Sequence, residues 1–472
     1  MRFGSYEVTL QTLRAIRFVW LIALVAAAAV TCIPKLAAGQ MPDRGTYVFA
    51  DVNVVPMDSE RVIRGVDVVV DAGRIVAVGS GLSTAFPAGA TVIDGTGKYL
   101  MPGLGEMHGH LPTAVSDAED SLFLYLAGGA TTVRGMQGHP SQLQIRERVR
   151  SGELLGPRMW LAAPSLSGNS APDAPTAERL VREAKAVGYD LLKVHEGLSA
   201  EAYAAIVATA TELELPWGGH VSQFVGVRGA LGAGQTTIDH LDDYVEAMQP
   251  AGSSAINAEG RERRRLMAMN ADPATIPELA RATRDAGVAV VPTQMLWETF
   301  GGSRDPDVLL ARPENRYMPK ATIDNWYQRI RTIYRSADRE ASARESELRQ
   351  ALLKTMYDSG VVVLMGTDAP QVFSVPGFSL HRELPLMVES GMTPYEVLRT
   401  GTVNVARHLG IEDRAGTVAV GIYADLLLLE DNPLEDITAV ANNAGVMIDG
   451  RRITPDVIAD RLEAIAEKYD QE

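Results

Sequence analysis

The middle of the chain alternates short apolar runs with longer segments in which apolar residues recur at helical spacing. Helical patterns lie between most of the runs, as in 177–187 and 200–213. Strands that alternate with helices are typical of parallel sheets, and eight such units predict a (β/α)8 TIM barrel within the α/β class. The eight candidate strands are 98–108, 130–136, 159–164, 190–195, 216–221, 236–240, 288–294 and 361–368.

Both ends of this α/β region are rich in β-branched residues. Short runs of this kind occur at 47–50, 66–70, 74–78 and 91–94, and again at 416–418, 424–429 and 445–449. Two separate small sheets would each have exposed edges and little core. We therefore predict one β-sandwich domain formed from both chain ends.

These patterns predict the domain organisation. Two connections within the barrel, 241–287 and 295–360, are too long for one helix, and we expect them to cover the site and shape the substrate pocket. The predicted parts are a signal peptide at 1–40, a composite sandwich at 46–100 and 409–455, the barrel at 101–408 and a C-terminal helix at 456–472.

The N-terminus has the pattern of a secretory signal peptide. Arg14 and Arg17 precede an apolar run, 18–33, and small residues follow at 37–39. The run is shorter than the ~20 residues that span a bilayer, which favours cleavage over the alternative of a membrane anchor. The single cysteine, Cys32, lies in this segment, where a lipoprotein attachment site is a further alternative. We expect an exported protein, periplasmic or secreted, with no stable membrane insertion after cleavage.

Composition and charge narrow the function classes. Of the 472 residues, 46% are hydrophobic and 22% are charged, which is ordinary for a folded protein with a large core. The formal net charge is −15, which argues against nucleic acid or anionic lipid as a partner, because both bind basic patches.

Two histidines at the end of the first barrel strand are the strongest chemical signal. His108 and His110 are two residues apart, so on a strand both side chains point to the same face. Gly109 between them leaves space. This spacing predicts metal ligands, and the alternative is a pair of core or surface histidines.

Four further residues lie in or at the ends of later strands. His220 and His240 each end a strand, and imidazole nitrogen suits zinc. Asp368 follows an apolar run and is a candidate metal ligand and general base, although aspartate is also a favoured helix N-cap. Lys193 lies in an apolar strand, where its alternative role is an ion pair. As an ammonium group it cannot bind metal, so a metal role needs a lowered pKa or covalent conversion into an acid. Ligands at the ends of successive parallel strands converge if the strands form a ring.

These residues resemble the amidohydrolase superfamily, specifically its imidazolonepropionase-like and prolidase-like branch. The resemblance covers roughly 46–455 and is specific for the superfamily but not for a substrate. The matching segments are Met101-Pro102-Gly103-Leu104-Gly105-Glu106-Met107-His108-Gly109-His110, Gly128-Gly129-Ala130-Thr131-Thr132-Val133-Arg134, Gly366-Thr367-Asp368-Ala369, His381-Arg382-Glu383-Leu384 and Gly421-Ile422-Tyr423-Ala424-Asp425-Leu426.

The resemblance implies two divalent metal ions, which we expect to be zinc. His108, His110 and Asp368 would bind one ion, and His220 and His240 the other. Lys193, carboxylated by carbon dioxide to a carbamate, would bridge them. The chain departs from the family pattern at Arg134-Gly135, where Arg-Asp is usual, and at Val194-His195-Glu196. Both departures concern the substrate pocket and leave the metal ligands in place.

The expected chemistry is hydrolysis of a carbon–nitrogen bond in a small amide, cyclic amide or dipeptide. A metal-bound water has a pKa of about 7, so hydroxide is available at neutral pH. Asp368 would serve as the general base. An esterase or phosphotriesterase and a non-catalytic metal-holding protein are the alternatives. His139, His195 and His381 are candidate substrate-orienting residues, or ordinary loop histidines. The expected partner is a small molecule, and a homo-oligomer is compatible with the sequence.

Overall fold

The computed structural model describes residues 42–471 apart from 83–86, 88 and 303. The described residues belong to one compact unit. The expected signal peptide at 1–40, with Cys32, lies outside the described residues. Among the helices of the described residues, none is both long enough and apolar enough to cross a membrane.

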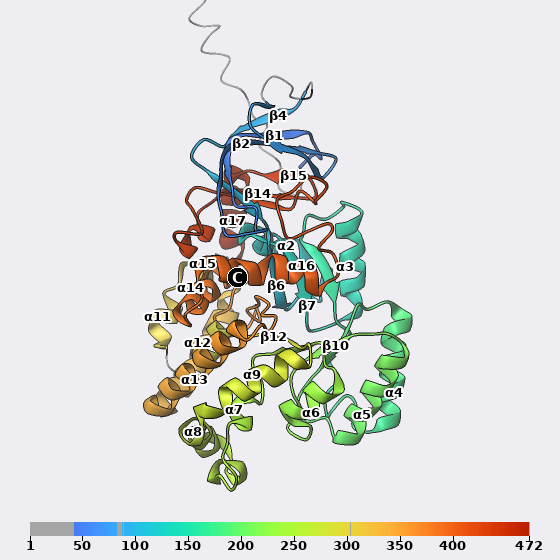
Figure 1. The fold of residues 1–472 in the computed structure, drawn as a ribbon, viewed down its shortest axis with the longest axis vertical. Coiled ribbons are helices and arrows are strands. Elements are labelled where there is room, and N and C mark those ends of the chain that lie inside the picture. The colour runs from blue at the N-terminus through green and yellow to red at the C-terminus, as the bar shows by residue number, and fades with distance from the viewer. Residues whose placement is uncertain (1–41, 83–86, 88, 303, 472) are drawn as a thin grey trace, which may run out of the picture. The chain divides into compact units, whose positions relative to one another are not determined.

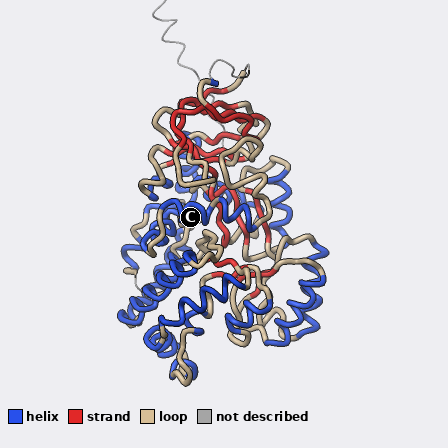
Figure 2. Tube along the Cα trace, in the orientation of Figure 1, coloured by secondary structure: helices blue, strands red, loops and turns tan. Residues whose placement is uncertain are grey.

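The strands form three sheets (Figures 1 and 2). They are β1 (Tyr47–Val54), β2 (Ile63–Asp71), β3 (Arg74–Gly79), β4 (Thr91–Asp94), β5 (Tyr99–Pro102), β6 (Leu104–Gly109), β7 (Ala130–Gly135), β8 (Arg158–Leu161), β9 (Leu192–Val194), β10 (Trp217–Gly219), β11 (Thr237–Asp239), β12 (Ala289–Val291), β13 (Leu426–Leu429), β14 (Asn443–Ile448) and β15 (Arg451–Ile453).

The helices lie between the strands of the middle region and at the C-terminal end. They are α2 (Ala118–Ala127), α3 (Pro140–Arg150), α4 (Ala174–Val187), α5 (Ala200–Glu212), α6 (Gly226–Ala233), α7 (Tyr244–Ala247), α8 (Gly260–Asn270), α9 (Ile276–Asp285), α10 (Gln294–Phe300), α11 (Pro306–Leu310), α12 (Lys320–Ser336), α13 (Arg339–Asp358), α14 (Leu380–Glu389), α15 (Pro394–Gly401), α16 (Val403–His408) and α17 (Pro455–Asp470).

Strands from both ends of the chain share one eight-stranded sheet. Its order is β15-β14-β13-β5-β1-β2-β3, with β4 paired to β1, so blue and red strands lie together in Figure 1. This finding excludes the alternative of two separate sheets. The predicted strand at 416–418 is wrong. This segment is a loop whose Val418 N–H donates to Pro56 O at 3.0 Å instead of joining the sheet.

The middle of the chain forms two parallel sheets flanked by helices. Their orders are β6-β7-β8 and β12-β11-β10-β9. The parallel bridge between Ala162 and Leu191 connects the segments after β8 and before β9. The α/β class is therefore confirmed, and seven of the eight predicted runs contain a strand of these sheets.

Two of the predicted runs are not single regular strands in the structure. The run 98–108 divides at Gly103 into β5, in the eight-stranded sheet (the end sheet), and β6, in a parallel sheet. A Cβ at Gly103 would lie 2.2 Å from Thr131 Oγ1. The run 361–368 is not a regular strand. It has only isolated pairings, such as Val290 with Val363 and the Asp368 N–H with His108 O at 2.7 Å.

Strand β13 joins two hydrophobic cores. Its four leucines are all buried, and successive side chains on a strand point to opposite faces. Leu427 and Leu429 pack into the core that contains Leu104 of β6, whereas Leu426 and Leu428 pack into the core of the end sheet. The end sheet therefore shares a continuous apolar core with the parallel sheets.

We expect Leu427→Ala to lower the free energy of unfolding by about 2–5 kcal/mol, because it leaves a cavity at a fully buried position between the sheets. Denaturant unfolding followed by circular dichroism measures this loss. Val420→Ala is the control, since Val420 is 62% exposed and its truncation should change little. Equal effects of the two substitutions would contradict the shared core.

Candidate functional site

The predicted metal ligands lie at or near the C-terminal ends of the central strands. His108 is in β6, Lys193 is in β9, and His220 and His240 directly follow β10 and β11. Asp368 ends the irregular run 361–368. Because these strands are parallel, their C-terminal ends lie on one side of the sheets, and the side chains can meet there.

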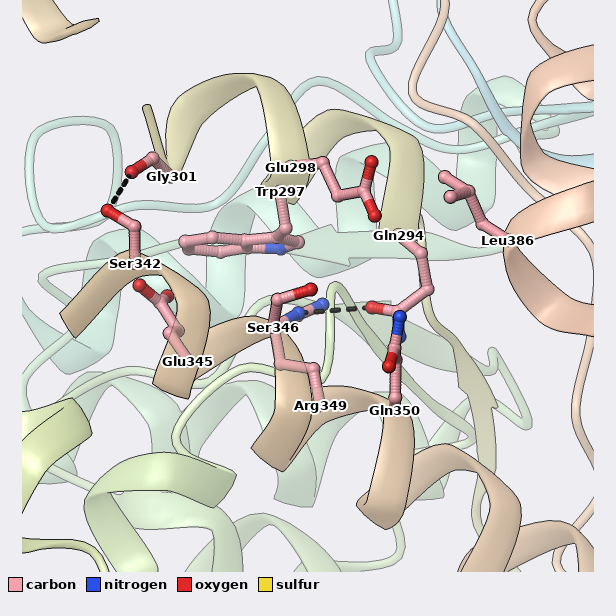
Figure 3. A pocket seen from close by; sticks show the side chains of 10 residues that line it. All are labelled: Gln294, Trp297, Glu298, Gly301, Ser342, Glu345, Ser346, Arg349, Gln350 and Leu386. Atoms are coloured by element: carbon pink, nitrogen blue, oxygen red, sulfur yellow. Dashed lines mark hydrogen bonds between the residues drawn. The ribbon is translucent and has the colours of Figure 1, made fainter. Parts of the chain in front are cut away.

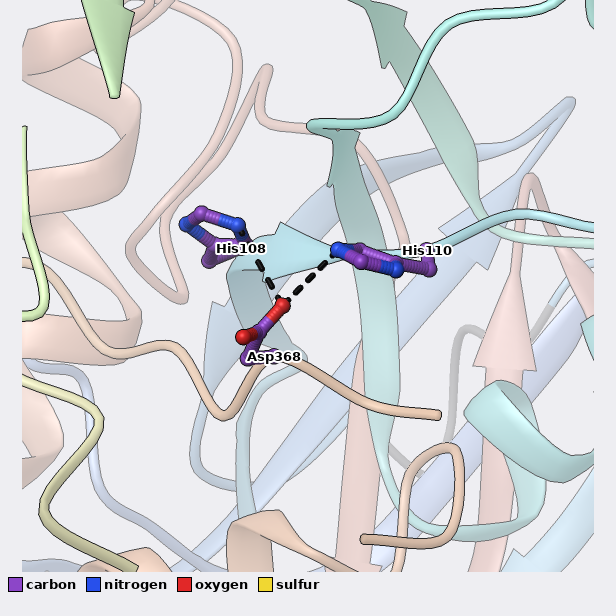
Figure 4. Close-up of side chains that lie close together, drawn as sticks. All are labelled: His108, His110 and Asp368. Carbon is purple, nitrogen blue, oxygen red and sulfur yellow. Dashed lines mark ion pairs between the residues drawn. The ribbon is translucent and has the colours of Figure 1, made fainter. Parts of the chain in front are cut away.

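His108, His110 and Asp368 form a compact group of metal-ligand type (Figure 4). Asp368 Oδ1 lies 2.8 Å from His110 Nε2 and 3.3 Å from His108 Nε2. One ligand atom from each residue lies within 4.8 Å of the other two. Two imidazoles and one carboxylate at this spacing form a candidate site for a divalent metal ion.

Three further histidines continue from this group as a row of adjacent rings. The ring of His240 lies 4.4 Å from that of His108 and 4.6 Å from that of His220, measured between centroids. The ring of His195 lies 4.1 Å from that of His220. The structure therefore brings both predicted groups of ligands, and His195, into one cluster.

Three imidazoles of this cluster, those of His108, His195 and His240, suit metal binding because burial favours their neutral form. Burial lowers the pKa of His108 and of His195 to about 4 and holds the pKa of His240 well below its usual value. His240 Nδ1 lies 2.9 Å from Thr293 Oγ1, and its other nitrogen, Nε2, is buried with no hydrogen-bond partner in the described structure. An unpartnered imidazole nitrogen that faces other ligands fits a metal ion.

Lys193 lies inside the cluster and forms no ion pair with a described carboxylate. Its Nζ lies 3.1 Å from His108 Nε2, and burial lowers the pKa of the amine. The alternative of an ion pair for Lys193 therefore finds no partner within contact distance among the described carboxylates. Gly219 accommodates the lysine stem, because a Cβ at this position would lie 2.6 Å from Lys193 Cδ.

Asp368 is not a helix N-cap. The next helix, α14, begins at Leu380, and Ser379 occupies its N-cap position. Burial acts to raise the pKa of Asp368, but His108 and His110 together hold it below its usual value. The carboxylate is therefore ionised at neutral pH and able to accept a proton.

Sequence reasoning missed a buried carboxylate that positions His108. Asp239 Oδ2 lies 2.7 Å from His108 Nδ1, which leaves Nε2 facing Lys193 and Asp368. Arg134 Nη2 donates to both oxygens of Asp239, at 3.1 and 3.2 Å. Burial acts to raise the pKa of Asp239, but Arg134, His108 and Lys193 together outweigh it and hold the pKa well below its usual range. The sequence does contain a signal for this pair, because Arg134 and Asp239 are charged residues inside apolar runs and Asp239 directly precedes His240.

Glu106 is a second buried carboxylate beneath the cluster that the sequence did not reveal. It accepts hydrogen bonds from the N–H groups of His108 and Thr367, at 3.0 and 2.8 Å, and from Thr367 Oγ1 at 2.6 Å. Burial raises its pKa to about 8. Glu106 thus links the two segments that carry His108 and Asp368.

We expect Asp239→Asn to lower the free energy of unfolding by about 3–5 kcal/mol, because the amide leaves Arg134 as a buried charge without a counter-ion. Chemical denaturation of the metal-free protein measures this effect. Glu183→Gln is the matched control, since it removes the carboxylate of an exposed pair with Arg179. If the two losses are alike, Asp239 is not a required counter-ion.

Two of the predicted substrate-orienting histidines lie outside the row of rings. His139 is exposed and caps α3, where its Nδ1 accepts from the Ser141 N–H at 3.3 Å. His381 is in α14, where its Nε2 lies 2.9 Å from Gly128 O and its ring packs on Phe378. Both have structural contacts that explain them, and their substrate roles stay predictions.

Known proteins resemble the chain over most of its length. An adenine deaminase from Paracoccus denitrificans is 24% identical over 91% of this chain, and an imidazolonepropionase from Idiomarina loihiensis is 24% identical over 82% of this chain and 92% of its own length. The chain spans only 63% and 60% of the length of two adenine deaminases it matches.

A solved structure of a Xaa-Pro dipeptidase with bound methionine has the same fold. It superposes with a TM-score of 0.64 at 20% identity and covers 87% of this chain and 100% of its own. The model of the amidohydrolase family matches residues 99–453, which is most of the chain and includes every residue of the histidine cluster. The protein is therefore a member of the amidohydrolase family, as its motifs predicted.

Proposed function

We propose that this protein is a metal-dependent hydrolase that cleaves a carbon–nitrogen bond in a small amide, cyclic amide or dipeptide. The observation that carries the proposal is the cluster of histidines around Asp368, which includes the compact group of His108, His110 and Asp368. A deaminase, an imidazolonepropionase and a dipeptidase are among the similar proteins, and all three names describe reactions at carbon–nitrogen bonds.

We assign two metal positions to the cluster. His108, His110 and Asp368 would hold one ion, and His220 and His240 the other, with Lys193 between them as a carbamate. Zinc suits such nitrogen and oxygen ligands. The unpartnered Nε2 of His240 supports the second position, because the described structure gives this nitrogen no other role. Bound metal would supply an activated water and polarise the scissile carbonyl.

Lys193 has the properties that carbamate formation needs. Carbon dioxide reacts with a neutral amine, and burial lowers the pKa of Lys193 and so favours that form. The reaction joins the amine nitrogen to the carbon of carbon dioxide and releases one proton. The product is an acidic group with two oxygens, which can bind metal where an ammonium group cannot.

Asp368 moves the proton in this proposal. Its carboxylate accepts a proton from the attacking water and returns it to the leaving nitrogen, so that the nitrogen departs as a neutral amine. His110 Nε2 lies 2.8 Å from Asp368 Oδ1, close enough for both atoms to bind the same ion. Asp239 fixes the ring of His108 from the opposite side, with its Oδ2 2.7 Å from Nδ1.

We further propose that the two parallel sheets and the run 361–368 close into a (β/α)8 barrel, with the end sheet folded as a sandwich. Two bridges support closure: Ala162–Leu191 connects the two parallel sheets, and Val290–Val363 connects β12 to the run 361–368. A third links the last run to the first strand, where the Met107 N–H donates to Met365 O at 2.8 Å. The barrel at 101–408 and the sandwich at 46–100 and 409–455 remain the proposed domains. We also propose that the protein is exported to the periplasm or outside the cell.

The proposal is tested by assaying purified, metal-loaded protein on amides, cyclic amides, dipeptides, esters and phosphotriesters. The proposal expects turnover on at least one carbon–nitrogen substrate, and loss of turnover after metal removal by a chelator. Turnover confined to esters or phosphotriesters would replace it with the alternative hydrolase class. No turnover on any class with metal bound would favour a metal-holding protein.

A further inference from the structure

A buried arginine outside the histidine cluster contacts the backbone of a proposed metal ligand. Arg349 lies in α13, within the long connection 295–360, and is 5% exposed. Its Nη2 donates to His240 O at 2.8 Å and to Pro292 O at 2.9 Å, so one amino group joins the segments that follow β11 and β12. None of the described carboxylates forms an ion pair with it.

Neighbouring residues hold the guanidinium in one orientation (Figure 3). Arg349 Nε donates to the side-chain oxygen of Gln294 at 3.1 Å, and the guanidinium lies 4.7 Å from the ring of Trp297. Glu383 accepts from the N–H groups of Gln294 and Met295, at 2.9 and 2.8 Å, which fixes the start of α10. The arginine is therefore placed with little freedom against the two carbonyls.

Each of the two joined segments contains a residue with left-handed backbone. His240 has φ of 64° and Thr293 has φ of 43°, values that non-glycine residues rarely adopt. Such a conformation persists only where the surroundings determine it. A cation on the His240 and Pro292 carbonyls supplies that constraint, and it holds Thr293 Oγ1 at 2.9 Å from His240 Nδ1.

We infer that Arg349 is a positioning residue for His240: it fixes the backbone of both segments so that Thr293 occupies Nδ1 and Nε2 faces the cluster. This inference rests on the proposed function, because it assigns His240 to the second metal. A buried arginine without a counter-ion is costly for stability alone. Helix α13 thus contributes to the site without supplying a ligand.

The test compares metal affinity in Arg349→Met, Arg349→Lys and the matched control Arg264→Met. Arg264 lies on the same indole, 5.8 Å from the Trp297 ring, but it pairs with Glu345 and does not contact His240. Titration calorimetry of the metal-free proteins with zinc, in bicarbonate buffer, gives the affinity of each site. Hydrogen exchange at the amides of residues 240–243 and 293–294 reports the backbone directly.

We expect Arg349→Met to weaken the second zinc site by about 10–100-fold, the range found for groups that orient metal ligands, and to raise exchange in both segments. Arg349→Lys should weaken it less, because an ammonium group can still reach a carbonyl. Arg264→Met should leave both sites as in the parent. Unchanged second-site affinity and exchange in Arg349→Met would overturn the inference. A parent protein that binds no second zinc would instead overturn the two-metal assignment on which the inference rests. If Arg349→Met does not fold, Arg349→Lys decides by the same two measurements.

Discussion

Replacing Asp368 with asparagine is expected to lower turnover by about 10²–10⁴ while the fold is retained, because the amide cannot accept the proton of the attacking water. The substitution preserves size, and asparagine tolerates the backbone at this position, where φ is 64°. Turnover on the best substrate measures the first effect. Circular dichroism and denaturant unfolding measure the second.

The control is Asp243→Asn, which makes the same change at a similar backbone conformation, with φ of 63°. Asp243 accepts from the Val227 N–H, in the first turn of α6, at 2.7 Å and is not a proposed metal ligand, so its substitution should not change the chemical step. Turnover of Asp368→Asn within a few-fold of the parent would remove Asp368 from proton transfer.

Lys193→Ala is expected to abolish turnover and to remove at least one of two metal ions. The side chain is buried and close to His108 Nε2, so no other described amine can take its place as a carbamate. Metal content by elemental analysis and turnover are the two measurements. A short carboxylic acid should restore part of both, because it can occupy the space of the missing group.

Lys98→Ala is the matched control, since Lys98 pairs with Glu430 on the end sheet, outside the cluster. Its metal content and turnover should equal those of the parent. Full metal content and normal turnover in Lys193→Ala would rule out the bridging role, whatever the result for Asp368.

The sequence predicted that these side chains lie close together, because each predicted ligand follows a recognisable apolar run. His108 and His110 share one strand face, and His220 and His240 end short strands. Parallel strands bring such positions together regardless of the lengths of the connections between them. The positions of ligands along a strand are thus a local property that one sequence contains.

Features that depend on distant contacts were not predictable. Asp239 and Arg134 are 105 residues apart and lie in strands of two different sheets, β11 and β7, so their contact depends on how the sheets are placed. Arg349 is 109 residues from the His240 carbonyl that it contacts. The division of 98–108 at Gly103 reflects the close approach of Thr131, which no local pattern shows. Histidines near strand ends also had ordinary structural explanations, as the helix cap at His139 illustrates.

The central claim is that one cluster holds two divalent ions with Lys193 between them. The most direct test is the metal content of the purified protein after reconstitution with zinc and bicarbonate. Six candidate ligands exceed what one tetrahedral ion needs, so we expect close to two ions per chain. One ion or none per chain would contradict the account.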